Sequence, residues 1–172
     1  HLGPKPYTDL EFTARDLPLA PVVLGAMPQA FRSGWEWSGA EGTISGRLRI
    51  FSCPALPEPF CFHSCWFTDN LMLRRLPLEP VVRDGTASVS GRLGPGRPMD
   101  VTGSLRVSRG ELSGRPVTGV IGDLAWSGAK LTFDLREAQY AGGTATGRLL
   151  REWKEGILTN AATLDLGGAR IE

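Results

Sequence analysis

Lysine, histidine and helix-forming runs are scarce in this chain. These shortages bear on nucleic-acid binding and on catalysis. Of its 19 basic residues only three are lysine, and the formal net charge is +1, so no basic run is available to neutralise phosphates. Nucleic-acid binding is therefore not expected. No apolar stretch is long enough to span a bilayer, and the chain starts at His1 without a basic-plus-apolar leader. We expect a segment excised from a longer protein, with any export signal or membrane anchor elsewhere in the parent chain.

Recognisable catalytic patterns are also missing. The two histidines are His1 and His63, and no Gly-x-Ser-x-Gly elbow, phosphate-binding Gly-x-x-x-x-Gly-Lys or His-Glu-x-x-His motif occurs. Carboxylates are scattered, and neighbouring pairs such as Asp134 and Glu137 are typical of solvated charges. We therefore expect neither an enzyme nor a bound cofactor.

Three cysteines leave one local question open. Cys61, His63 and Cys65 alternate along a predicted strand, and Cys53 precedes them across a proline-rich loop. These are zinc-ligand types, but residues four apart on a strand lie about 13 Å apart, too far for one tetrahedral ion or for a direct bridge. The interpretations are inert half-buried thiols or a disulfide from Cys53 to Cys61 or Cys65. A metal site of Cys53, Cys61, His63 and Cys65 is a remaining candidate, but no metal is predicted.

Glycine and proline, by contrast, are abundant at 22 and 13 residues, which favours many short strands joined by turns. The segments 42–48, 85–93 and 143–149 share a Gly-Thr start and a Gly-Arg-Leu end. Successive side chains of a strand point to opposite faces, so each segment has a polar lane and an apolar lane that contains a glycine. Because glycine fills no core, we interpret these glycines as points where a sheet bends and leaves room on its apolar face.

The pattern as a whole predicts one mainly β domain over residues 1–172, a curved antiparallel meander with one short helix near the N-terminus. The helix is expected at about residues 20–31, with Pro21 in its first turn. Turn signals such as Arg109-Gly110 and Gly142-Gly143 separate successive segments. The predicted strands cover residues 10–15, 42–51, 60–73, 86–93, 100–107, 117–126, 131–136, 144–151 and 157–166.

The order of these elements resembles a known group of proteins. Leu17-Pro18-Leu19 follows a strand and precedes the short apolar helix, after which come Gly-Thr-x-x-Gly-Arg-Leu and a run of hairpins. The stretch from Gly103 to Gly147 carries most of the likeness, which covers nearly the whole chain. In these features the chain resembles the AsmA-like superfamily, which includes the AsmA and TamB relatives of Gram-negative envelopes. Residues 162–166 alternate much as residues 10–15 do, which fits one repeat unit.

This resemblance implies a β-groove, in which antiparallel strands curl into a taco-shaped trough and stacked repeats form an apolar channel. It implies a non-enzymatic periplasmic segment of an inner-membrane-anchored cell-envelope protein, which conducts acyl chains for outer-membrane lipid transport or assembly. The implied partners are phospholipid or another acyl lipid and neighbouring repeats of the same chain.

A groove of this kind needs an apolar concave face with small residues where the sheet bends. Gly46, Gly91, Gly103 and Gly147 meet that need in the apolar lanes. The predicted lipid-binding lining consists of Ile44, Leu48, Ile50, Val89, Leu93, Val101, Leu105, Val107, Leu131, Phe133, Leu135 and Leu149. The alternative is a structural or adhesive β module with a closed core and no ligand.

Overall fold

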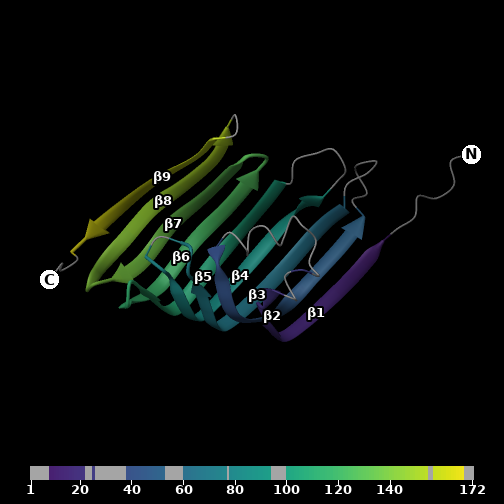
Figure 1. Ribbon diagram of the computed structural model, residues 1–172, viewed down its shortest axis with the longest axis horizontal. Coiled ribbons are helices and arrows are strands. Elements are labelled where there is room, and N and C mark those ends of the chain that lie inside the picture. Colours follow the sequence, from purple (N-terminus) through teal and green to yellow (C-terminus); the bar gives the residue numbers. More distant parts are fainter. Residues whose placement is uncertain are drawn as a thin grey trace, which may run out of the picture.

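The computed structural model describes residues 8–21, 25, 38–52, 60–76, 78–93, 100–154 and 157–168. These residues form one nine-stranded antiparallel sheet in which each strand pairs with its neighbours in sequence. Figure 1 shows the strands side by side in chain order, from purple β1 at one edge to yellow β9 at the other. The sheet is open, since β1 and β9 lie at its two ends. The predicted mainly β meander is confirmed.

The strands are β1 (Asp9–Pro18), β2 (Ala40–Ser52), β3 (Phe60–Leu73), β4 (Val81–Leu93), β5 (Asp100–Leu112), β6 (Arg115–Ser127), β7 (Lys130–Tyr140), β8 (Gly143–Lys154) and β9 (Ile157–Gly167). Each predicted segment lies within one of these strands. The turn predicted at Arg109-Gly110 is wrong, because Gly110 pairs with Val117 inside the sheet and β5 continues beyond it. The turn instead contains Ser113 and Gly114, whose φ angles of 50° and 75° suit a two-residue hairpin.

The predicted helix is a minor part of the described structure. Within residues 20–31, Pro21 and Gly25 are helical, while residues 22–24 and 26–31 lie outside the described residues. Strands therefore account for nearly all of the regular structure in the part of the chain that is described.

Irregularities in strand pairing fall in one band across the sheet, which we call the bulge line. Register shifts occur at Ala14/Leu17, Thr43/Ser45, Val82/Asp84, Asp84/Gly85, Thr118/Ile121, Ile121/Gly122 and Leu135/Ala138. In β1 the band includes Asp16, whose φ is 48° and whose backbone N–H donates to Ser45 Oγ at 2.9 Å. In β3 the Thr68 hydroxyl donates to the Thr43 carbonyl at 2.7 Å. Bulges bend and twist the strands that carry them, so this band accounts for the curvature of the sheet.

Most of the buried apolar side chains lie along the bulge line, in two clusters. The first cluster is built from Leu19, Ala40 and Ile44. The second is built from Val117, Ala138 and Ala145. Away from this band, Phe62 and Val101 are also buried, and they flank Gly91 on neighbouring strands. The core is therefore concentrated toward one end of the strands.

Candidate functional site

The strand register assigns the side chains to two faces, because directly paired residues of antiparallel strands point to the same side. Three rows cross one face, which we call the apolar face. The first row is Leu10, Ile50, Phe62, Gly91, Val101, Trp126, Leu131, Arg151 and Asn160; the second is Phe12, Leu48, Ser64, Val89, Gly103, Leu124, Phe133, Leu149 and Ala162; the third is Ala14, Gly46, Trp66, Ala87, Leu105, Gly122, Leu135, Gly147 and Leu164. The other face, the polar face, carries mostly Thr, Ser, Arg and Asp.

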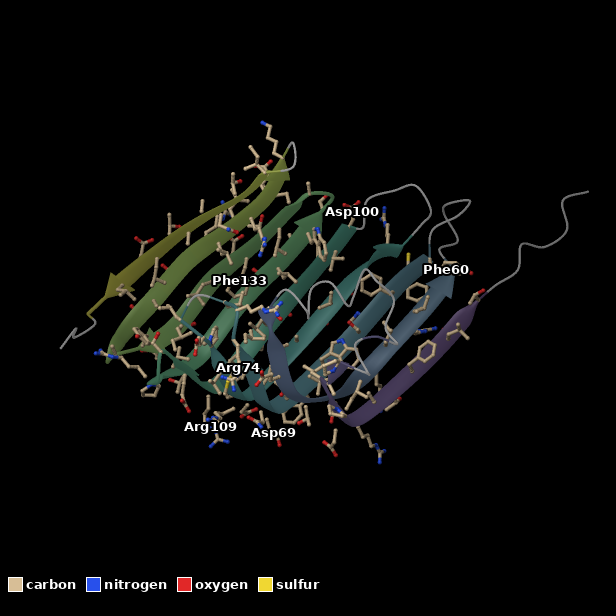
Figure 2. The ribbon with its side chains drawn as sticks, viewed as in Figure 1. Phe60, Asp69, Arg74, Asp100, Arg109 and Phe133 are labelled. Atoms are coloured by element: carbon tan, nitrogen blue, oxygen red, sulfur yellow. The ribbon has the colours of Figure 1, made fainter. Side chains whose placement is uncertain are left out.

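All residues of the predicted lining have register positions on the apolar face. Ile44, Val101 and Val107 are buried. Those that are half-buried are Leu48, Ile50, Val89, Leu105, Leu131, Phe133, Leu135 and Leu149. Leu93 pairs with Phe60, and its side chain lies outside the described part of the structure. Figure 2 shows Phe133 over the middle of the sheet, between the strand ends near Asp100 and those near Arg109.

Several large side chains of the apolar face are additional to the predicted lining. They are Leu10, Phe12, Phe62, Trp66, Leu124, Trp126, Leu164 and Leu166. At the two edges of the sheet they are solvent-exposed, with 53% of Phe12 and 54% of Leu164 accessible. The same alternation that selected the predicted residues extends to these positions, so the sequence signal for them was present.

Two of the glycines predicted to leave room on the apolar face, Gly46 and Gly91, lie against aromatic rings. A Cβ at Gly91 would lie 2.5 Å from the Asp100 carbonyl oxygen and would meet Cε1 and Cζ of Phe62 at 2.7 and 2.8 Å. A Cβ at Gly46 would approach the Cys65 carbonyl oxygen most closely and would also meet Cε3 of Trp66 at 2.6 Å. The interpretation of empty space at these positions is therefore wrong, because the ring of the paired residue and a carbonyl oxygen of a neighbouring strand occupy it.

Elsewhere on the apolar face, glycine permits close approach by backbone atoms of the neighbouring strand, or by a ring two residues along that strand from the paired position. A Cβ at Gly103 would lie 2.6 Å from the Ser88 carbonyl oxygen, and one at Gly147 would lie 2.5 Å from that of Thr163. At Gly122 the Phe133 ring takes the corresponding space, at 2.5 Å. Glycine thus allows tight strand packing, and rings from neighbouring strands restore apolar cover.

The polar face places two carboxylates directly opposite each other. Asp123 of β6 pairs with Asp134 of β7, and each contacts an arginine, Arg136 and Arg148 respectively. The hydrogen bond from Arg148 is the largest cause that lowers the pKa of Asp134 below its usual value of 3.8. These charges are solvent-exposed, and exposed ion pairs add little stability. The polar face is a charge-balanced surface suited to water.

Two of the three cysteines differ in oxidation state. Cys61 is disulfide-bonded, whereas Cys65 is an exposed free thiol. Cys53 lies outside the described residues. Since the sulfur of Cys61 is oxidised, it cannot serve as a thiolate ligand in the candidate metal set, and His63 Nδ1 lies 2.8 Å from Ser90 Oγ. Among the described residues no group of three His, Cys, Asp or Glu side chains is arranged to hold a metal ion.

No helix among the described residues is both long and apolar enough to cross a membrane. Comparison with protein-family models, with curated proteins and with solved structures found no match.

Proposed function

We propose that this domain binds lipid acyl chains along its apolar face, without catalysing a reaction. The main support is the extent of that face, since apolar rows cross the nine strands and most of their large side chains are only half-buried. Exposed apolar surface of this extent is typical of interaction sites. The polar face, with its Thr, Ser and paired charges, remains suited to water.

Acyl chains bind such a surface through apolar burial, which contributes about 0.8 kcal/mol for each buried methylene. The central residues Val89, Leu124 and Leu149 are half-buried, so part of each side chain is available for contact. Contact of this kind recognises an acyl chain without selecting one lipid. We infer phospholipid or another acyl lipid as the ligand class.

The wider setting follows from the AsmA-like resemblance. In that setting the domain is one segment of an inner-membrane-anchored protein of the periplasm, with neighbouring repeats of the same chain as partners. Its role is the transport or assembly of outer-membrane lipid. The apolar face supplies a surface on which acyl chains are kept from water.

The proposal is tested by purifying the domain, extracting it with organic solvent and measuring phospholipid by mass spectrometry. Leu105→Asp and Phe133→Asp each place a charge on the apolar face and are expected to remove most of the lipid. Matched controls are Thr102→Asp and Thr132→Asp, which place the same charge on the polar face of the same two strands. Circular dichroism establishes that each variant is folded.

Lipid recovery from folded Phe133→Asp at the wild-type level would contradict the proposal. The same holds if wild-type protein neither carries phospholipid nor takes it up from vesicles. Either outcome favours the structural or adhesive β module with a closed core.

A further inference from the structure

The two edge strands of the sheet differ in how well they are protected from pairing with another strand. Among the described residues, β1 pairs only with β2, and β9 pairs only with β8. An edge strand presents a row of backbone N–H and C=O groups on its outer side, and natural sheets protect such edges with charged residues, proline or bulges. The sequence and register of each edge strand therefore indicate whether it can accept a partner.

The β1 edge has all three protections. Asp9–Pro18 contains four charged residues and ends in a proline. Its register shifts between Ala14 and Leu17, where Asp16 has a φ of 48°. The bulge and the proline interrupt the row of backbone groups, so a second strand cannot pair along the whole of β1.

The β9 edge lacks these protections. Ile157–Gly167 contains no proline, lysine or arginine, and Asp165 is its only charged residue. Its pairing with β8 runs through all 11 residues without a register shift. Exposed apolar side chains accompany this edge, with 54% of Leu164 and 40% of Leu166 accessible. A long, regular and nearly uncharged edge is a template for another strand.

We propose that a second copy of this chain occupies the β9 edge, so that the two β9 strands pair antiparallel about a two-fold axis at Ala162. The proposal does not depend on lipid binding. Ala162 is the central residue of Ile157–Gly167, so this register pairs the whole length of both strands. Paired residues of antiparallel strands point to the same side, so the apolar faces of the two copies join. Because β1 is protected, the assembly closes at two copies instead of extending into a filament.

The charges of β9 favour this register. Asp165 lies opposite Thr159 of the second copy, and the two Asp165 carboxylates are six residues apart along the strands, about 20 Å. Salt screens exposed charges at that separation. A register centred on Asp165 would instead place the two carboxylates directly opposite each other, which is unfavourable. The β9 residues that meet on the joined apolar face, Asn160, Ala162 and Leu164 among them, are uncharged.

Cysteine cross-linking tests the register, in a Cys65→Ser background that removes the exposed free thiol. Directly opposite Cα atoms lie about 4.5–5.5 Å apart, so mild oxidation of Ala162→Cys is expected to give a disulfide-linked dimer. Leu164→Cys is the matched control, since this position is also exposed but its counterpart lies four residues away, about 13 Å. It is expected to stay monomeric. Equal cross-linking of the two variants would overturn the axis at Ala162.

Charge at position 162 tests the association without a covalent bond. Analytical ultracentrifugation of the wild-type chain is expected to show a reversible monomer–dimer equilibrium. Ala162→Lys and Ala162→Glu each place like charges directly opposite each other and are expected to weaken the dimer about fivefold. An equimolar mixture of the two variants pairs opposite charges, so dimers are expected to return. Ala14→Lys, the same substitution on the apolar face of β1, is expected to dimerise as the wild type does.

Three results would overturn the proposal. The first is a wild-type chain that remains monomeric at about 1 mM, a concentration that populates even a weak dimer. The second is a dimer weakened by Ala14→Lys and not by Ala162→Lys, which would assign the association to β1. The third is a mixture of Ala162→Lys and Ala162→Glu that associates no better than either variant alone. Circular dichroism establishes that each variant is folded, as expected for substitutions at the exposed Ala162.

Discussion

The ring of Phe62 on β3 lies against Gly91 on β4, where the ring atoms occupy the space that a Cβ would fill. Phe62 is only 2% exposed, so the ring has little freedom to move aside. Gly91→Ala is therefore expected to destabilise the domain by about 1–3 kcal/mol, the usual cost of overpacking. Chemical denaturation measures this change, with Ser88→Ala on the polar face of the same strand as the control. A Gly91→Ala variant as stable as wild type would contradict the packing described.

A second substitution separates conflict with the Phe62 ring from the other effects of the alanine. Combining Gly91→Ala with Phe62→Leu removes the ring that the new methyl group meets and leaves the Asp100 carbonyl oxygen, 2.5 Å from that methyl group, in place. The loss in the double variant is expected to be smaller than the sum of the two single losses, because the residues are in contact. Strict additivity would indicate that the alanine does not act through the Phe62 ring.

The pairing of Asp134 with Arg148 predicts a specific pH dependence. The folded-state pKa of Asp134 lies below its usual value of 3.8. Its stabilising contribution is therefore fully present above that unfolded value and is lost as the pH falls through the lower folded pKa. NMR titration of the Asp134 carboxyl carbon is expected to show an upward shift of this pKa in Arg148→Met. An unchanged midpoint in that variant would show that Arg148 is not the cause.

The two described cysteines are expected to differ in reactivity. In the native protein without reductant, a thiol reagent is expected to modify Cys65 and to leave Cys61 unmodified. Peptide mapping by mass spectrometry gives the answer directly. Reductant is expected to lower stability by about 2–5 kcal/mol if the disulfide behaves like those of other small domains. Cys65→Ser is the control, since it removes the free thiol and keeps the disulfide; alkylation of Cys61 in this variant would refute the assignment.

Burial on the apolar face predicts a gradient of mutational cost. Ile44 is 3% exposed at the bulge line, and Leu164 is 54% exposed at the β9 edge. Ile44→Ala is expected to cost about 2–5 kcal/mol, whereas Leu164→Ala costs no more than about 1 kcal/mol. Thermal or chemical unfolding compares the two variants. Equal losses would mean that the edge of the apolar face is covered in solution.

Which side chains share a face of this sheet could be predicted from sequence, because successive side chains of a strand point to opposite faces. Alternation in segments such as 42–48 assigns Thr43 and Ile44 to opposite faces, and the register places both as expected. Arg151 follows Ala145, Gly147 and Leu149 in the same lane, so its place on the apolar face was also contained in the pattern.

Features that depend on neighbouring strands could not be predicted in this way. The bulge at Asp16 is closed by the hydroxyl of Ser45, a residue 29 positions away. The role of Gly110 within β5 depends on the Val81 carbonyl oxygen, which would lie 2.6 Å from an added Cβ. Likewise, glycines on the apolar face indicate missing side chains, but only the register shows which ring or carbonyl oxygen of a neighbouring strand lies against each one.

The order of the strands also governs how this sheet assembles. Every strand is bonded to its neighbours in sequence, so each step of folding closes only the loop between consecutive strands. Such a sheet behaves as a nearly one-dimensional array, in which stability is close to a sum of terms between adjacent strands. Folding can nucleate at any hairpin and spread toward both ends, and unfolding begins where a strand has one neighbour, at β1 and β9. Strands can therefore be added to or removed from either end without rerouting the rest of the chain.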